Sequence, residues 1–302
     1  IEELFIEGFR VKRKYVMKIS AVTFIKNGEI LGYPFIQSIK SVLPIVDEFV
    51  VNVGESEDNT LAQIQSINNS KIRIIKSKWN DHMKDKGYVY GQQKMIAHFN
   101  CCYDWAFYVE ADEIYHEDDL IKIKSAMQDN IMDSNVEALA FNFLHFYGNA
   151  NSYLDSPGWY RSEARIIKNS IRTYSPDGLF WVVLDNNKNG RYPRAKIIDA
   201  YCYHYGWVRT EEEMNLKSSK VQKYWDKVPT KIDYGQMDQS IIKKFEGTHP
   251  QVVKSWLPKD SRLYRVDENY QLTKKQKKHQ LMIKIEKLLG LELSKKHYQL
   301  IK

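Results

Sequence analysis

Hydrophobic and polar residues follow two different periods along the first third of the chain. Short runs of β-branched and aromatic residues predict strands at 18–24, 48–53, 72–76 and 105–109. Amphipathic stretches between these runs predict helices at 30–42, 60–67 and 90–99. Strands that alternate with helices at this spacing form βαβ units. We therefore predict an α/β protein with a Rossmann-like, mostly parallel sheet flanked by helices.

Beyond residue 115 the pattern changes. It predicts a helix at 117–132 and a long strand at 136–146, followed by short strands, aromatic residues and turn sequences as far as Gly206. We expect this loop-rich region to shape a pocket. The chain then divides into four segments: 1–17, 18–115, 116–270 and 271–302.

The last segment carries the charge. Residues 271–302 contain nine lysines and two glutamates, which equals the net charge of +7 of the whole chain. In this segment Leu281, Ile285, Leu288 and Leu289 share one helical face beside lysines and predict a basic amphipathic helix. The rest of the chain is neutral overall, which argues against an enzyme with a basic groove for nucleic acid.

Other features of the composition exclude further classes. No apolar run approaches the roughly 18 to 20 residues that cross a bilayer, and no signal peptide opens the printed sequence. We therefore expect a soluble, cytoplasmic protein. Cys101, Cys102 and Cys202 have neither the number nor the spacing of a disulfide framework or a zinc site.

An acidic cluster follows the strand predicted at 105–109. Glu110, Asp112 and Glu113 would lie at the carboxyl end of that strand, where open α/β sheets bind ligands. Clustered carboxylates repel one another unless a cation compensates, and Mg²⁺ or Mn²⁺ prefers carboxylate oxygens while leaving room for phosphates. The cluster predicts a metal-diphosphate site. The alternative is an ordinary turn whose acidic residues cap the next helix.

Two polar loops follow the first two predicted strands. They are Thr23-Phe-Ile-Lys-Asn-Gly28 and Gly54-Glu-Ser-Glu-Asp-Asn-Thr60. Polar side chains and exposed helix-start amides at strand ends suit the base and phosphates of a nucleotide. Neither a Gly-x-Gly-x-x-Gly nor a Walker A sequence is present, so we expect neither a Rossmann dinucleotide site nor a P-loop. Ser56 or Asp58 could alternatively serve only as a helix cap.

These features together resemble the family 2 glycosyltransferases of the GT-A fold. The resemblance rests on the first loop, on Ser-x-Asp-x-Thr at 56–60 and on Glu-Ala-Asp at 110–112. It covers residues 18–120 and extends more loosely to about residue 209. Val53 and Gly54 replace the acidic pair that the family often has after the second strand. Glu-Ala-Asp replaces the family's Asp-x-Asp and keeps both carboxylates.

The resemblance implies a metal-dependent, inverting glycosyltransferase that moves a sugar from a nucleoside diphosphate sugar to a hydroxyl acceptor. The acceptor would be a glycan or lipid-linked glycan in surface glycan synthesis. Segment 18–115 would bind the donor, and segment 116–270 would bind the acceptor and close the site. The implied donor-binding residues are Thr23, Lys26, Asn27, Glu55, Asp58, Trp79, Asp81, Gln93, Glu110, Ala111, Arg209 and Lys217.

The implied metal ligands come from two parts of the chain. Asp112 would bind Mn²⁺ or Mg²⁺ and bridge it to the diphosphate, with Glu110 contacting the ribose or the metal. GT-A enzymes often complete the metal shell with a histidine, which here would be His204 in an aromatic segment. Arg209 lies nearby in sequence and could neutralise the diphosphate. A structural histidine is the alternative for His204.

An inverting transfer also needs a general base, normally a carboxylate near the acceptor hydroxyl. The candidates are Asp177 in a Ser-Pro-Asp-Gly turn, Asp155 and Glu163. Asp177 is preferred because its turn leads into the aromatic Leu-Phe-Trp at 179–181. The alternative is a turn aspartate without a chemical role.

Two other functions remain open. A sugar nucleotidyltransferase would carry a glycine-rich basic loop after the first strand, where residues 24–28 offer one lysine and one glycine. A catalytically inactive glycan-binding module could keep the same fold. The basic C-terminal segment could lie on the inner face of the cell membrane, or it could pack on the body or form a homo-oligomer.

Overall fold

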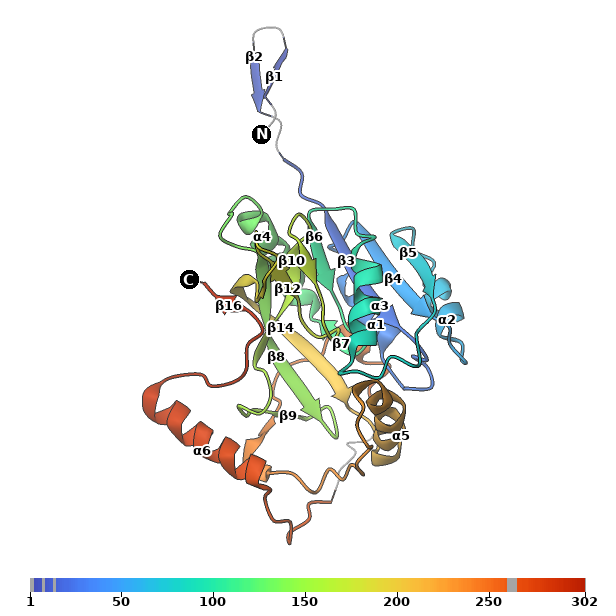
Figure 1. The fold of residues 1–302 in the computed structure, drawn as a ribbon, viewed down its shortest axis with the longest axis vertical. Helices are drawn as coiled ribbons and strands as arrows, with labels where there is room; N and C mark the ends of the chain where they lie inside the picture. Colours follow the sequence, from blue (N-terminus) through green and yellow to red (C-terminus); the bar gives the residue numbers. More distant parts are fainter. Residues whose placement is uncertain (1–2, 7–8, 13–14, 260–264, 302) are drawn as a thin grey trace.

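A computed structural model describes residues 3–6, 9–12, 15–259 and 265–301 of the chain (Figure 1). β1 (Glu3–Ile6) and β2 (Phe9–Lys12) pair antiparallel as a hairpin that stands apart from the main body in Figure 1. Within the described residues, no helix combines the length and the hydropathy that a bilayer span requires.

The N-terminal half of the main sheet is parallel. Its strands, in the order in which they pair, are β6 (Trp105–Tyr108), β3 (Ile19–Ile25), β4 (Glu48–Gly54) and β5 (Ile72–Ser77). The helices between them are α1 (Phe35–Val42), α2 (Thr60–Ser66) and α3 (Tyr88–His98). Alternate residues of β3 belong to two buried clusters, one that includes residues of α1 and one that includes residues of α3. This arrangement confirms the predicted α/β class.

Two predicted helices begin later than expected. α1 starts after Pro34 instead of at residue 30, because residues 29–32 form a turn in which Gly32 has a φ of +61°. The predicted helix at 117–132 is a 3₁₀ turn at Glu117–Asp119 followed by α4 (Leu120–Asn130).

Antiparallel strands extend the sheet beyond β6. They pair in the order β10 (Ser162–Lys168), β8 (Ala138–Tyr147), β9 (Ser152–Leu154) and β15 (Ile242–Lys244). The long strand β14 (Arg194–Trp207) pairs parallel with β8 and antiparallel with β7 (Glu113–Tyr115). Its register places His204 opposite Glu113 on β7 and His145 on β8. The strand therefore brings His204 to the acidic cluster.

The remaining elements surround this sheet. A small sheet consists of β11 (Thr173–Tyr174), β12 (Val182–Leu184) and β13 (Gly190–Arg191). After β14 come α5 (Glu211–Gln222) and short 3₁₀ turns at Lys223–Trp225, Gln239–Ile241 and Gln251–Val253. The predicted C-terminal helix is α6 (Lys274–Leu289), and β16 (Gln299–Leu300) then pairs with β14 at the edge of the sheet. The sequence pattern did not predict β16.

Candidate active site

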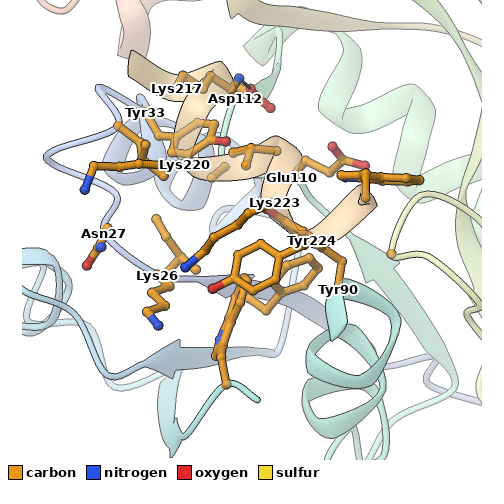
Figure 2. A pocket seen from close by; sticks show the side chains of 18 of the residues that line it. Lys26, Asn27, Tyr33, Tyr90, Glu110, Asp112, Lys217, Lys220, Lys223 and Tyr224 are labelled. Atoms are coloured by element: carbon orange, nitrogen blue, oxygen red, sulfur yellow. Dashed lines mark hydrogen bonds and ion pairs between the residues drawn. The ribbon is translucent and has the colours of Figure 1, made fainter. Parts of the chain in front are cut away.

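A cavity of about 530 Å³ lies at the carboxyl ends of β3 and β6, with α5 along one side (Figure 2). This volume is in the range of about 300 to 1,000 Å³ that small-molecule sites occupy. The predicted site residues that line it are Lys26, Asn27, Trp79, Asp81, Glu110, Ala111, Asp112, Asp177, His204 and Lys217. Residues that are far apart in the sequence thus meet at one edge of the sheet, where α/β proteins bind ligands.

The loop after β3 is fixed by the Ser-x-Asp-x-Thr sequence. Asn27 has a left-handed backbone with a φ of 55°, and its N–H donates to Ser56 Oγ at 3.0 Å. The N–H of Gly28 donates to Thr60 Oγ1 at 2.8 Å, and the N–H of Ile30 donates to Asp58 Oδ2 at 2.9 Å. The hydroxyl and carboxylate groups of this sequence therefore position the loop, and Asp58 does not line the cavity.

Aromatic side chains form one wall of the cavity. Trp79, Tyr90 and Tyr224 contact one another with ring centroids 5.2 to 5.6 Å apart. A Cβ atom at Gly54 would lie 2.5 Å from Trp79 Nε1, so the glycine is what allows the indole to cross the end of β4. This packing explains why no acidic side chain stands at Gly54. Such a wall can pack on the flat face of a base or a sugar.

Asp81 lies beside this wall among cationic groups. Its carboxylate accepts a hydrogen bond from the Tyr224 hydroxyl at 2.5 Å and from Lys223 Nζ at 3.3 Å, and Lys26 Nζ is 3.8 Å away. The hydrogen bond from Tyr224 and the two lysines lower the pKa of Asp81. The group is therefore an ionised acceptor at neutral pH.

Asp112 has two partners, one on each carboxylate oxygen. Lys217 Nζ on α5 donates to Oδ2 at 3.0 Å, and His204 Nε2 lies 3.7 Å from Oδ1. Burial alone would raise the pKa of Asp112, but the charges of Lys217 and Arg209 lower it below its ordinary value. Burial also lowers the pKa of Lys217 to about 8. Figure 2 shows Lys217 beside Asp112 at one end of the cavity.

Glu110 lies at the cavity but is joined to a buried arginine. Arg165 Nη2 is 3.0 Å from Glu110 Oε1 and 2.6 Å from Glu113 Oε1. Burial, followed by the nearby charge of Glu113, raises the pKa of Glu110 to about 8. Glu113 is fully buried and forms a structural pair with Arg165.

Two histidines on neighbouring strands fix each other's protonation. His145 Nε2 is 2.8 Å from the carbonyl oxygen of Tyr160, and a carbonyl only accepts, so His145 carries a proton on Nε2. Burial lowers the pKa of both imidazoles, which favours their neutral forms. His145 Nδ1 then accepts from His204 Nδ1–H at 3.0 Å. The lone pair of His204 Nε2 is left facing the carboxylate of Asp112.

The donor set fits a divalent cation that is shared with a substrate. Among the described residues, no group of three or more His, Cys, Asp or Glu side chains is arranged to hold a metal ion. Asp112 and His204 offer an oxygen and an imidazole nitrogen that face each other. Mg²⁺ and Mn²⁺ commonly take only one or two protein ligands and complete their shell with water and phosphate oxygens. Glu110, the third predicted ligand, lines the cavity and has Oε1 3.0 Å from Arg165 Nη2.

Several predicted site residues do not line this cavity: Thr23, Glu55, Asp58, Gln93, Asp155, Glu163 and Arg209. Thr23 is buried within β3, and Glu55 lies 3.8 Å from Lys78 on the surface. The Gln93 side-chain oxygen accepts from Asn52 and Ser77, which joins α3 to β4 and β5.

The other three have partners of their own. Arg209 donates to the carbonyls of Leu31 and Gly32 at 3.2 and 3.1 Å and so supports the turn before α1. Asp155 pairs with Arg161 at 2.7 Å. Glu163 is fully buried and lies 2.5 Å from His297 Nδ1. Among the candidate bases, only Asp177 therefore lines the cavity.

Lys217 belongs to a row of lysines whose other members were not predicted from the sequence. Lys217, Lys220 and Lys223 all line the cavity from α5 and its 3₁₀ continuation. Their spacing of three residues would have indicated one basic helical face, had the helix been predicted. Tyr33, Tyr90 and Tyr224 also line the cavity but were not predicted, because the sequence does not separate them from core residues.

Comparisons with known proteins give similarity of structure at low sequence identity. No protein-family model matches the sequence, and no curated protein matches it. The structure is similar to S. aureus TarS 1–349, with 16% identity and a TM-score of 0.42 over 68% of this chain and 65% of that one. For the complex of S. aureus TarS 1–349 with UDP, the identity is 12% and the TM-score 0.39, over 68% of this chain and 66% of that one.

A second similar structure is glucosyl-3-phosphoglycerate synthase from Mycobacterium tuberculosis in complex with Mn²⁺, UDP-glucose and phosphoglyceric acid. The identity is 15% and the TM-score 0.31, over 42% of this chain and 44% of that one. The chain thus spans less than two thirds of each of these structures. Similarity at this level assigns no activity.

Proposed function

We propose that the chain is a glycosyltransferase that moves a sugar from a nucleoside diphosphate sugar to a hydroxyl acceptor. The observation that carries the proposal is a single cavity that contains Asp112 and His204, which face each other, together with a row of lysines and an aromatic wall. A diphosphate needs cationic groups, and a base or sugar ring needs a flat apolar surface. The family resemblance of residues 18–120 supports the same reaction.

Each part of the cavity has a role in this proposal. Asp112 and His204 would hold Mn²⁺ or Mg²⁺, which would stabilise the charge on the departing diphosphate. Lys217 and Lys220 would contact phosphate oxygens from α5. Lys26 and Asn27 would contact the nucleoside from the loop after β3, and Asp81 would accept hydrogen bonds from it.

Asp177 would act as the general base. Its loop lies against α3, because Gly91 leaves room for the Ser175 carbonyl, which would be 2.3 Å from a Cβ atom at residue 91. The carboxylate would take the proton of the acceptor hydroxyl while the hydroxyl oxygen forms a bond to the anomeric carbon of the donor sugar. The bond from that carbon to the diphosphate breaks, and the configuration inverts. The proposed acceptor is a glycan or a lipid-linked glycan.

The test is release of nucleotide from UDP-sugars and GDP-sugars with Mn²⁺ or Mg²⁺, with the anomeric configuration of the product read by NMR. Asp112→Asn and Asp177→Asn should each lower turnover by about 10²- to 10⁴-fold. Asp155→Asn should retain wild-type turnover, because Asp155 lies outside the cavity.

Three outcomes would contradict the proposal. Near wild-type turnover of Asp112→Asn at saturating Mn²⁺ would remove the metal role. Loss of turnover in Asp155→Asn, with Asp177→Asn active, would move the general base. Release of pyrophosphate from a nucleoside triphosphate and a sugar phosphate, without transfer from any nucleotide sugar, would indicate a nucleotidyltransferase.

A further inference from the structure

Helix α6 packs on the body through its more polar side. Glu286 accepts from Arg161 at 2.7 and 3.1 Å and from the N–H of Leu293 at 2.7 Å. The ring of His279 lies directly against Gly158, where a Cβ atom would be 2.4 Å from it. Ile283 adds an apolar contact to a buried cluster that contains Leu154. These residues recur every three or four positions and so define the face that docks on the body.

The opposite face of α6 is apolar and exposed. Leu281, Ile285 and Leu288 are 58%, 36% and 82% exposed, and their spacing of four and three residues places them in one stripe. Leu289, the last residue of the helix, and Leu291 just beyond it are also exposed. An amphipathic helix normally turns its apolar stripe toward the core. Here the orientation is reversed, so the stripe needs an apolar partner outside the described body.

The charges around this stripe are all positive. Each of the six lysines of α6 is exposed, and those on the side of the stripe are Lys274, Lys277, Lys278 and Lys284. Glu286 is the only acidic residue of the helix, and it lies on the docked face with Arg161. The outward face therefore combines aliphatic side chains with uncompensated positive charge.

We propose that the outward face of α6 lies on the surface of an anionic lipid bilayer. Aliphatic side chains can enter the boundary between headgroups and acyl chains while flanking lysines contact anionic headgroups. A symmetric contact with a second copy would place these lysines against one another, which is unfavourable. Nucleic acid fits less well, because the stripe between the lysines has no aromatic residue for stacking. The proposal is independent of the chemistry proposed for the cavity.

Co-sedimentation with vesicles tests the proposal. The full chain is mixed with vesicles of phosphatidylcholine alone or with added phosphatidylglycerol, at low and at high salt. The double variant Leu281→Ser/Leu288→Ser removes the stripe, and Lys277→Gln/Lys284→Gln removes two charges. The matched control is Ile121→Ser/Lys124→Gln on α4, where Ile121 is 79% exposed and Lys124 is exposed too.

We expect the wild type and the α4 variant to sediment with anionic vesicles and to be released by salt. The lysine variant should bind roughly 30-fold more weakly, at about 1 kcal/mol for each lysine. The leucine variant should bind at least about tenfold more weakly. All substituted side chains point outward, so thermal melting should show that each variant remains folded.

Two results would overturn the proposal. The first is equal sedimentation of the wild type and both α6 variants. The second is absence of the wild type from anionic vesicle pellets. If the wild type then also forms oligomers that the leucine variant does not form, the stripe is a protein interface.

Discussion

Replacement of His145 by leucine tests whether this buried histidine orients His204 toward Asp112. Leucine is apolar and cannot accept the proton on His204 Nδ1 or donate to the carbonyl of Tyr160, two contacts that His145 makes at 3.0 and 2.8 Å. The imidazole of His204 would then lose its orientation. Glutamine at residue 145 offers one acceptor and one donor and so can replace both contacts.

The size of the effect follows from these contacts. Two buried polar groups without a partner should destabilise the His145→Leu protein by about 1 to 3 kcal/mol each. Loss of the group that orients a metal-binding histidine typically weakens metal affinity by about 10- to 100-fold. We therefore expect His145→Leu to weaken Mn²⁺ binding in that range. His145→Gln should stay within about tenfold of the wild type.

Electron paramagnetic resonance of free and bound Mn²⁺, with a nucleoside diphosphate present, measures the affinity. The ¹⁵N chemical shifts of the two imidazoles in metal-free protein give the tautomers independently of activity. His98→Leu is the control for stability, because His98 is also buried but packs on Trp181 and does not line the cavity. Wild-type Mn²⁺ affinity in folded His145→Leu, or a proton on Nε2 of neutral His204, would refute the reasoning.

Two further changes test the packing of the site and of the sheet. In Gly206→Ala the new methyl group would lie 2.6 Å from His204 Nε2 and 3.0 Å from Asp112 Oδ2. The Mn²⁺ affinity should therefore fall by about tenfold, while the melting temperature changes little. A Mn²⁺ affinity equal to that of the wild type would contradict this expectation. The carboxylate of Glu137 accepts hydrogen bonds from Arg191 and Arg194. Burial would raise the pKa of Glu137, but these hydrogen bonds lower it below its ordinary value. The ion pairs therefore stabilise the fold above the unfolded pKa of roughly 4.3, and this stabilisation is lost as the pH falls through the lower folded pKa. Glu137→Gln should therefore lower the free energy of unfolding by about 1 to 3 kcal/mol at pH 7 and by less below pH 4, and a difference that is independent of pH in urea melts would argue against the ion pairs.

Local patterns were sufficient to predict the parallel half of the sheet. β3, β4, β5 and β6 begin and end within two residues of the predicted bounds. β3, β4 and β6 are buried along almost their whole length and therefore read as largely apolar runs, whereas the edge strand β5 was recognised by its isoleucines. The α1 helix starts later than predicted because Pro34 and the left-handed Gly32 favour a turn before it. Apolar periodicity does not report such backbone preferences, so helix starts are less certain than strand positions.

Asp112 and His204 were candidates from the sequence because one follows a buried strand and the other lies in an aromatic strand. The structure places both at the cavity, and their role there stays a prediction. The partners of these two side chains depend on how distant strands pair, and local sequence patterns do not reveal that pairing. His145 reaches His204 only because β14 pairs with β8 in one particular register. Gln93 and Arg209 do not line the cavity, and their polar groups bond to side-chain and backbone partners within the fold.

The C-terminal segment shows why truncation would be a poor test of its function. β16 pairs with β14, and just before it Tyr298 contacts Ser162 Oγ at 2.6 Å. His297 pairs with Glu163 and stacks on Phe180 with ring centroids 4.4 Å apart. Phe180 belongs to the loop that carries Asp177, so removal of residues 271–302 would disturb the proposed general base together with α6. A truncated chain that lost both turnover and vesicle binding would therefore not separate catalysis from membrane contact. Substitutions confined to the outward face of α6 separate the two, because the side chains of that face are exposed. The contacts of Glu286, His297 and Tyr298 with the body lie elsewhere.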